Sequence, residues 1–355
     1  LFAGVWLDRV RRRPVMIAAD FVRAALLLAI PGLAWLGALR IESLVAIGLL
    51  LGVLTVFFDV AEQAYVPTLV RPDQLVEANS RRQTNYAFAE VAGPGLAGGL
   101  IQGIGAPAAV IIDAASFVVS ALLLRRIRAP EPAPASGGRR SLWREIGEGL
   151  AEVGRNPILR TLAASTGVWN LFAYARNAML IVFLARDLRL GAGAIGLVFT
   201  IGSLGFLAGT LLPMRAAARL GLGRAIVCGI IGTMPGSILI PLAGGPPQIA
   251  AAMVALGLAL QGIADPSYDV NQFSLRQAVI PPSLQGRLAA SVRVIIRGVV
   301  PIGAVLGGAL AGPIGLRGVM WVGALGAPLA LAIVWFSRVR SLQRAPAPTW
   351  AEADA

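Results

Sequence analysis

The chain has 355 residues, of which 57% are apolar and only 14% charged, and its mean hydropathy is +0.75. Soluble proteins carry about 25% charged residues, so this composition excludes an ordinary soluble globular domain. The sequence contains no histidine, no lysine and one cysteine, Cys228, which excludes a Ser-His-Asp triad, a histidine metal site, a Walker phosphate loop and an intrachain disulfide. We therefore expect no enzymatic activity, no cofactor and no bound metal.

Apolar runs recur along the chain, and each is long enough to cross a bilayer, which takes roughly 20 residues of helix. Residues 1–6 are interpreted as the end of one further span. The sequence thus predicts an all-α, polytopic membrane protein. The ten candidate spans are 14–38, 43–68, 84–105, 106–126, 158–184, 192–214, 223–243, 247–268, 288–312 and 316–337.

A short charged stretch, GVWLDRVRRR, lies near the start between two apolar segments. A glycine turn, an aspartate and clustered arginines suit a cytoplasmic hinge between two spans. Asp8 is placed to face the positive end of a helix dipole or an arginine across a bundle interface. The alternative is that the arginines only set the membrane topology. The candidate gating residues are Gly4, Asp8, Arg9, Arg12 and Arg13.

The net charge of +13 comes from arginine alone, and its distribution alternates from loop to loop. With the Asp8 loop in the cytoplasm, 23 of the 31 arginines fall in loops on that side. Only Arg40, Arg186, Arg189 and Arg317 fall on the other side. This positive-inside bias predicts a multi-pass membrane protein with a cytoplasmic C-terminus, and it gives no reason to expect a nucleic-acid partner. The lysine-free, arginine- and alanine-rich composition suggests a GC-rich genome, so we expect the bacterial inner membrane.

The middle of the chain interrupts the apolar rhythm with prolines, glycines and charges. Within it, Trp143, Ile146, Leu150 and Val153 recur at helical spacing, which predicts an amphipathic helix on the cytoplasmic surface. A plain solvated linker is the alternative. The predicted domains are an N-terminal bundle (1–128), a linker (129–156), a six-helix bundle (157–338) and a cytoplasmic tail (339–355).

The two bundles resemble each other at an offset of about 207 residues. Residues 69–80 align with 279–291, and VAGPGLAGGL at 91–100 aligns with VVPIGAVLGGAL at 299–310. Parallel repeats of this kind occur in transporters built from two helical bundles. We therefore expect two pseudo-symmetric six-helix bundles, with the first helix and most of the second missing from the first bundle.

These features resemble the major facilitator superfamily over nearly the whole chain. Within it, AADFVRAALLL (18–28), FFDVAEQAYVPTLV (57–70), Ala78–Asn79, Gly93–Pro94 and IIDAASFVVSALLL (111–124) are similar to the subgroup of the enterobactin exporter and macrolide-efflux-type proteins. The hinge departs from the family pattern in having Val10 where glycine is usual. The glycines after Pro94 are spaced one residue wider than in the antiporter pattern.

Ionisable residues inside spans are candidates for gating or ion coupling, because each costs about 2.5–3.5 kcal/mol at a helix centre. Asp20 and Arg23 are spaced for an intrahelical pair. The resemblance implies that the helices carrying Asp59 and its counterpart Asp265 border the central cavity, and snorkelling to the interface is the alternative for their carboxylates. Glu90 and Asp113 are expected deeper, with Glu90 opposite Arg297. The full candidate set is Asp20, Arg23, Asp59, Glu62, Glu90, Asp113, Asp265, Asp269 and Arg297.

One span carries a midspan cation among polar and aromatic residues, in the run WNLFAYARNAML (169–180). This pattern predicts a substrate-binding surface, although aromatic residues in spans also face lipid or the core. The cavity candidates are Trp169, Asn170, Phe172, Tyr174 and Arg176.

Together these patterns predict a monomeric secondary transporter that exports an amphipathic small molecule, a drug or siderophore, by alternating access and proton antiport. Its expected partners are the lipid bilayer, the small-molecule substrate and protons. Two alternatives stay open: a facilitator-fold importer of a polar nutrient, and a non-transporting membrane scaffold or sensor. A cavity rich in hydrogen-bonding side chains would favour the importer.

Overall fold

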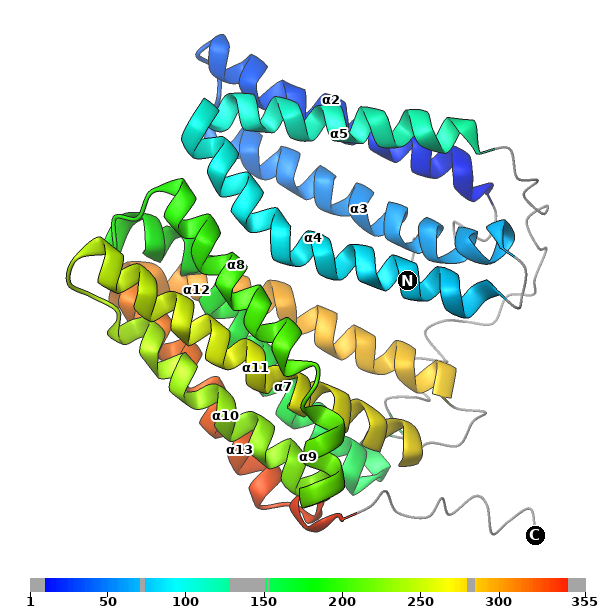
Figure 1. The fold of residues 1–355 in the computed structure, drawn as a ribbon, viewed down its shortest axis with the longest axis vertical. Helices are drawn as coiled ribbons and strands as arrows, with labels where there is room; N and C mark the ends of the chain where they lie inside the picture. Colours follow the sequence, from blue (N-terminus) through cyan, green and yellow to red (C-terminus); the bar gives the residue numbers. More distant parts are fainter. Residues whose placement is uncertain (1–9, 71–73, 128–150, 152, 280–284, 344–355) are drawn as a thin grey trace. The chain divides into compact units, whose positions relative to one another are not determined.

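The computed structural model describes residues 10–70, 74–127, 151, 153–279 and 285–343, and every regular element in these ranges is a helix (Figure 1). The all-α prediction is thereby confirmed. Within these ranges, eight helical stretches are long and apolar enough to cross a membrane: 12–35, 41–62, 106–126, 157–187, 192–209, 222–242, 247–276 and 298–335. The predicted span at 84–105 is not among them, and the two predicted spans 288–312 and 316–337 overlap one continuous stretch.

The chain divides by its contacts into two units, residues 1–89 with 99–139 and residues 90–98 with 140–355. Unit 1 holds most of four helices: α2 (Arg12–Trp35), α3 (Ile41–Leu69), α4 (Leu75–Ile104) and α5 (Ala106–Arg126). Within it α2 packs against both α3 and α5. Met16, Ala61 and Tyr65 form a small buried cluster between α2 and α3.

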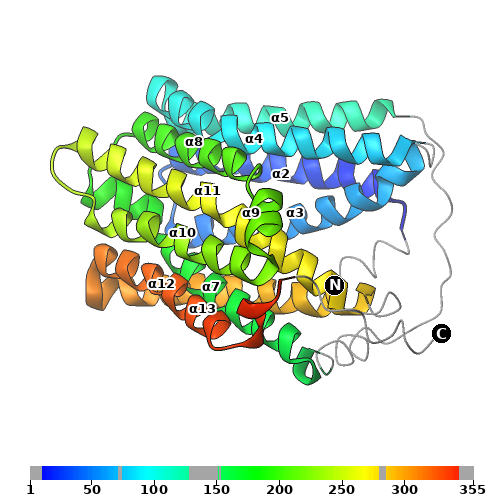
Figure 2. The same cartoon turned by 60° about the horizontal axis from the view of Figure 1, so that its bottom comes forward.

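Unit 2 holds the remaining helices, and Figure 2 shows α8, α11 and α10 lying side by side. Asn156 begins α7, because its side chain accepts hydrogen bonds from the N–H groups of Ile158 and Leu159. The elements are α7 (Pro157–Val182) with a π-helical turn η2 (Phe183–Asp187), α8 (Ala192–Gly209), α9 (Pro213–Leu220), α10 (Leu222–Leu242), α11 (Pro247–Val279), α12 (Gln285–Ala324), α13 (Gly326–Trp335) and a 3₁₀ turn η4 (Arg338–Ser341).

Glycines let the helices of unit 2 approach closely, as in other membrane bundles. A Cβ on Gly307 would overlap the backbone of Ala175 on α7. A Cβ on Gly205 would lie 2.6 Å from the Cα of Ala259 on α11. These positions explain why α12 packs along α7 and why α8 packs along α11.

Two pairs of turn glycines repeat along the chain. Gly37 and Gly245 have φ angles of 64° and 83°, and each lies between two consecutive spans. Gly105 (φ 83°) separates α4 from α5, and Gly315 (φ 71°) breaks α12 into two helical segments. Glycine adopts such angles without steric cost. The members of each pair are about 210 residues apart, which agrees with the offset seen in the sequence.

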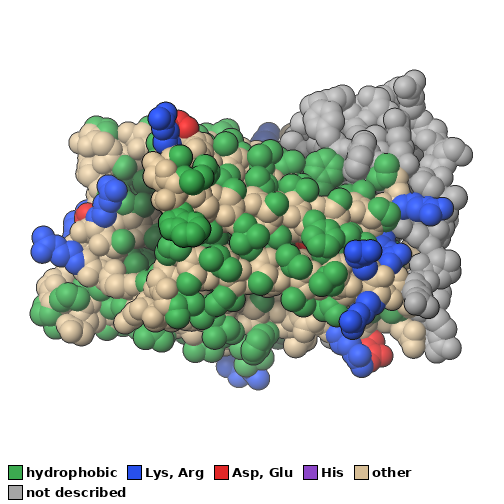
Figure 3. All heavy atoms as spheres, turned by 90° about the horizontal axis from the view of Figure 1, so that it is seen from above, with side chains coloured by type: hydrophobic (Ala, Val, Ile, Leu, Met, Phe, Trp, Pro, Cys, Tyr) green, Lys and Arg blue, Asp and Glu red, His purple; other side chains and the backbone are tan. Residues whose placement is uncertain are grey.

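Many large apolar side chains face outward rather than inward, for example Leu49 (67% exposed) and Leu197 (61%). Figure 3 shows one face on which hydrophobic side chains form a broad band and the arginines gather toward its ends. Such a surface is stable in the hydrocarbon of a bilayer and would aggregate in water.

Candidate functional site

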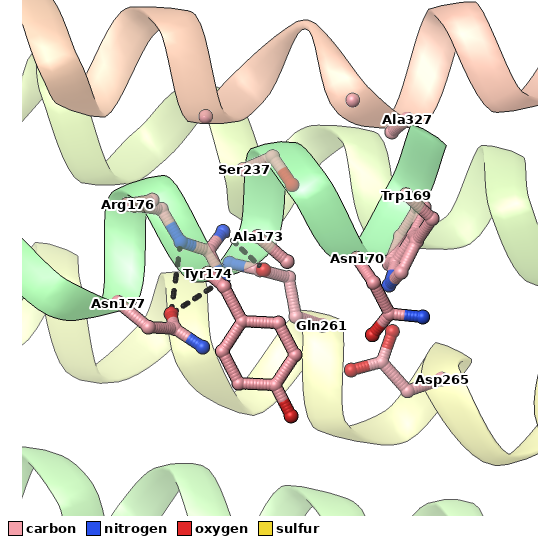
Figure 4. A pocket seen from close by; sticks show the side chains of 12 residues that line it. Trp169, Asn170, Ala173, Tyr174, Arg176, Asn177, Ser237, Gln261, Asp265 and Ala327 are labelled. Carbon is pink, nitrogen blue, oxygen red and sulfur yellow. Dashed lines mark hydrogen bonds between the residues drawn. The ribbon is translucent and has the colours of Figure 1, made fainter. Parts of the chain in front are cut away.

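A pocket of about 170 Å³ lies inside unit 2 (Figure 4). Five helices enclose it, and most of its side chains come from α7 and α11. Its lining residues are Trp169, Asn170, Ala173, Tyr174, Arg176, Asn177, Ser237, Gln261, Asp265, Gly323, Gly326 and Ala327.

Arg176 is held in this pocket by amide groups. Its Nη1 donates a hydrogen bond to Oε1 of Gln261 at 2.6 Å, across from α7 to α11. Its Nε and Nη2 donate to Oδ1 of Asn177 at 3.3 and 3.2 Å. A Cβ at position 323 would overlap the aliphatic stem of Arg176, so Gly323 provides the space for that stem. The guanidinium is thus buried and fixed by neutral acceptors.

Asp265 lines the same pocket, one helical turn after Gln261 on α11. Figure 4 shows its carboxylate on the same side of the pocket as Asn170. Among the described residues it forms no ion pair within 4.0 Å, with Arg176 or with any other cation. The pocket therefore holds a cation and a carboxylate that are close but not joined.

An aromatic wall closes one side of the pocket. Trp169 stacks on Tyr268 with 5.9 Å between ring centroids and 28° between ring planes. The Tyr268 hydroxyl shares a hydrogen bond of 2.8 Å with the Thr166 hydroxyl and lies 3.4 Å from Ser165 Oγ. Because Tyr268 is buried and held in this way, it keeps the Trp169 ring in place.

A buried ionic network joins three helices of unit 1. Asp20 and Arg23 form an ion pair of 3.1 Å on α2, as their spacing predicts, and their side chains are only 1% and 6% exposed. Ser120 of α5 donates to the Asp20 carboxylate at 2.7 Å. Arg23 donates to the Leu54 carbonyl of α3 at 2.9 Å and lies over the Phe58 ring at 4.7 Å. The pair therefore ties α2 to α3 and α5.

A second polar cluster in unit 1 joins α3 to α4. The Tyr86 hydroxyl donates to Glu62 at 2.8 Å, and Arg82 lies 3.9 Å from the same carboxylate. Asp59, three residues before Glu62, is half-buried on α3. Glu62 is thus engaged within its own unit.

Of the hinge residues, Gly4, Asp8 and Arg9 lie outside the described residues, whereas Arg12 and Arg13 begin α2. Arg13 donates from Nε to the Leu124 carbonyl at 3.0 Å and from Nη2 to the Arg125 carbonyl at 2.6 Å. These are terminal carbonyls of α5, where a cation is favoured. Arg13 therefore caps α5 within unit 1.

The structure brings together only some of the candidates named from the sequence. Four of the five cavity candidates line the pocket, whereas Phe172 does not and packs instead beside Gly326 of α13. Asp265 joins them, although the sequence placed it in a separate group near the cytoplasmic end. Asp269 is exposed one turn further along α11.

The side chains of Glu90 and Asp113 are exposed, and neither lines the pocket of unit 2. The Arg297 side chain lies outside the described part of the chain, as does most of the predicted amphipathic helix at 141–155. The proposed pairing of Glu90 with Arg297 thus stays a prediction.

Sequence reasoning missed Asn177, Ser237 and Gln261. The spacing of polar residues in the sequence could have identified Gln261. One face of α11 carries a polar residue at every third or fourth position: Gln261, Asp265, Asp269, Gln272 and Arg276. No sequence pattern could have identified Ser237, because a single serine in an apolar span is common. Over the described residues, no three acidic or Cys side chains lie close enough together to hold a metal ion.

The fold and the site identify the chain as a helical membrane protein that has repeated helical elements and a polar pocket inside one of its two units. The sequence profile of the Major Facilitator Superfamily matches residues 1–176 and 170–353, and the chain belongs to this superfamily of transporters. The resemblance noted from the sequence is thereby confirmed.

Several relatives have been named for transport. The chain is 28% identical over 313 residues to the uncharacterized MFS-type transporter y4rN of Sinorhizobium fredii, covering 86% of this chain and 74% of that protein. It is 27% identical to the multidrug efflux pump Tap of Mycolicibacterium fortuitum, covering 98% and 86%. It is 24% identical to the macrolide efflux protein A of Streptococcus pyogenes, covering 88% and 77%.

Solved structures share the fold at low sequence identity. A bacterial homologue of the iron transporter ferroportin, in its inward-facing state, matches with a TM-score of 0.68 at 18% identity, covering 94% of this chain and 84% of that one. A bacterial homologue of the human lysosomal transporter Spinster matches with a TM-score of 0.68 at 16% identity, covering 97% and 87%. At these identities the likeness concerns the fold alone.

Proposed function

We propose that this transporter exports an amphipathic small molecule, such as a drug or siderophore, by alternating access coupled to proton antiport. One observation carries the proposal: buried Arg176 lines one pocket beside a stacked aromatic pair, together with Asp265, whose carboxylate forms no ion pair with any described residue. Relatives named for multidrug and macrolide efflux support export as the direction.

The pocket offers the contacts that an amphipathic molecule needs. Trp169 and Tyr174 present aromatic surface, and Asn170 and Gln261 present hydrogen-bonding groups. The rings of a substrate can therefore stack on the aromatic side chains, while its polar substituents form hydrogen bonds with the amide side chains.

Asp265 is our choice for the coupling group. A proton and a nearby positive charge, from a substrate or from Arg176, compete for the carboxylate at the pocket wall. Protonation of Asp265 and binding of the substrate therefore oppose each other. Asp59 is its repeat-related counterpart in unit 1, and Glu90 and Asp113 are retained as secondary candidates. Asp8 and its neighbouring arginines are proposed to gate the conformational change.

The arginine distribution supports a topology with the C-terminus in the cytoplasm of the bacterial inner membrane. The end of unit 2 where α7 begins carries Arg155, Arg160 and Arg215, and the opposite end carries Arg186, Arg189 and Arg317. We propose a monomer that catalyses no reaction and binds no nucleic acid.

Proton release from inverted membrane vesicles tests the proposal. Vesicles containing the protein expressed from its full reading frame are acidified inside, and a panel of macrolides, other antibiotics and siderophores is added while a pH-sensitive dye is followed. We expect proton release with at least one compound, and its loss in Asp265→Asn. Asp187→Asn is the matched control, because Asp187 is exposed at the far end of unit 2.

If Asp265→Asn behaves as the wild type, a triple amide variant of Asp59, Glu90 and Asp113 comes next. Retention of coupled transport in that variant as well contradicts coupling through carboxylates at any of these positions. If a protein shown to be folded releases no protons with any compound of the panel, export is contradicted.

A second candidate function is import of a polar nutrient. The pocket favours it in one respect, since Asn170, Asn177, Ser237 and Gln261 all bring hydrogen-bonding groups to its lining. Uptake of radiolabelled sugars, nucleosides and organic acids into right-side-out vesicles distinguishes the two. Uptake driven by an inward proton gradient supports import, and its absence together with drug-dependent proton release supports export.

A further inference from the structure

A second hollow lies on the surface of unit 2, along α9, α10 and α11, with a volume of about 610 Å³. It shares no lining residue with the pocket around Arg176. Leu220 of α9 and Leu260 and Ile263 of α11 form its apolar walls. Small residues, including Gly229 and Gly232 of α10, complete its lining. The result is an apolar groove.

The charged residues that line the groove are two arginines of α9. Arg215 and Arg219 lie one turn apart on α9, line the groove and are exposed. Arg215 Nη1 donates to the Leu211 carbonyl of its own helix at 3.3 Å. No acidic side chain lines the groove, and neither arginine forms an ion pair with any residue that the structure describes. Both cations are therefore available to an anion.

The α9 side of the groove lies at the end of unit 2 that carries most of the described arginines of that unit. The N–H groups of Leu222 and Gly223, at the start of α10, donate to the Gln343 and Leu342 carbonyls at 3.2 and 2.8 Å. This places α9 and the start of α10 beside η4, which carries Arg338 and Arg340. An excess of arginine marks the cytoplasmic side of a membrane protein, and the negative surface potential of the cytoplasmic leaflet attracts basic segments.

We propose that this groove is a binding site for one anionic phospholipid. An acyl chain lies along the apolar walls, and the phosphate accepts hydrogen bonds from Arg215 and Arg219. An apolar groove open to a bilayer is filled by a lipid chain, because water there would lack hydrogen-bond partners. The charge selects an anionic headgroup, since the groove offers no carboxylate to an ethanolamine or choline ammonium.

Native mass spectrometry of the detergent-purified protein tests the assignment. The protein is titrated with phosphatidylglycerol and with phosphatidylcholine of identical acyl chains. Each arginine near an anionic lipid headgroup contributes roughly a fivefold preference, so we expect roughly a twenty-five-fold preference for phosphatidylglycerol overall. The double variant Arg215→Gln/Arg219→Gln should lose this preference, and Arg215→Lys/Arg219→Lys should keep most of it.

The matched control is Arg186→Gln/Arg189→Gln, which removes two exposed arginines at the opposite end of unit 2 and should retain the full preference. Cys228→Trp fills the groove without changing charge and should also abolish phosphatidylglycerol binding. Equal binding of the two lipids by the wild type overturns the proposal, as does an undiminished preference in either the double glutamine or the Cys228→Trp variant.

The single cysteine supplies a second readout that needs no variant. Cys228 is exposed in the groove, so its rate of reaction with N-ethylmaleimide reports whether the groove is occupied. We expect slower labelling in vesicles that contain phosphatidylglycerol than in pure phosphatidylcholine vesicles, because the arginines hold an anionic lipid in the groove longer than the chain of a zwitterionic lipid stays there. Equal rates in both, or protection by inorganic phosphate alone in phosphatidylcholine vesicles, would show that no anionic lipid is selected.

Discussion

Arg176 of α7 and Gln261 of α11 are joined by a hydrogen bond of 2.6 Å from the guanidinium Nη1 to the amide Oε1. Both side chains are buried, at 8% and 5% exposure. A neutral partner fixes the position of the cation without cancelling its charge. The bond therefore leaves Arg176 able to respond to a substrate or to the nearby carboxylate of Asp265.

Replacing Gln261 with leucine should weaken substrate binding. Without Gln261 the Arg176 guanidinium is no longer positioned for the substrate, and a hydrogen bond to a charged group contributes about 1.5–3 kcal/mol. If that contact with the substrate is lost, the dissociation constant rises roughly 10- to 150-fold. Equilibrium binding of a compound identified in the export panel measures this. Gln248→Leu is the control, since Gln248 is exposed in the first turn of the same helix. Unchanged affinity in Gln261→Leu would place the substrate outside this pocket.

Asp265→Asn should separate gradient-driven transport from exchange. An amide at this position cannot gain or lose a proton, so uphill transport should stop and its dependence on pH should disappear. Substrate counterflow between two compartments at equal pH requires no net proton movement, and it should continue. Both rates are measured in the same proteoliposomes. Equal loss of the two would mean that Asp265 serves binding or folding instead of coupling.

Gly307 and Gly308 provide an adjacent pair with opposite surroundings. A Cβ on Gly307 would overlap the backbone of Ala175, whereas a Cβ on Gly308 has nothing within 4 Å. Gly307→Ala should therefore lower the melting temperature, because overpacking costs about 1–3 kcal/mol. Gly308→Ala should be neutral or slightly stabilising, because alanine favours a helix over glycine by about 1 kcal/mol. Similar melting temperatures for both variants would contradict the close packing of α12 on α7.

The Asp20–Arg23 pair should be far more costly to break than an exposed pair with similar spacing. Removing one partner of a buried pair costs about 3–5 kcal/mol, because it leaves an uncompensated charge. We expect a large loss of thermal stability in Asp20→Ala and partial recovery in Asp20→Ala/Arg23→Met. Glu77→Ala is the control, since the Glu77–Arg81 pair is 62% and 78% exposed and contributes at most about 1 kcal/mol. No recovery in the double variant would show that Asp20 acts through Ser120 alone.

The sequence by itself determined the features that depend on one helix at a time. Hydropathy predicted most of the spans, because each span must satisfy its own backbone hydrogen bonds within about 20 apolar residues. The spacing of three residues predicted the Asp20–Arg23 pair, because residues i and i+3 share a helix face whatever surrounds the helix. The cluster at 169–176 likewise predicted four of the pocket residues.

Only the tertiary structure decided which faces meet. Ser120 reaches Asp20 from 100 residues away, and Gln261 reaches Arg176 from 85. It also placed Asp265 in the pocket and left Glu90 and Asp113 with exposed side chains. The physical reason is that hydropathy fixes the length of a span but not its rotation. Rotation is set by close contacts such as that of Gly307 with Ala175, which depend on the partner helix.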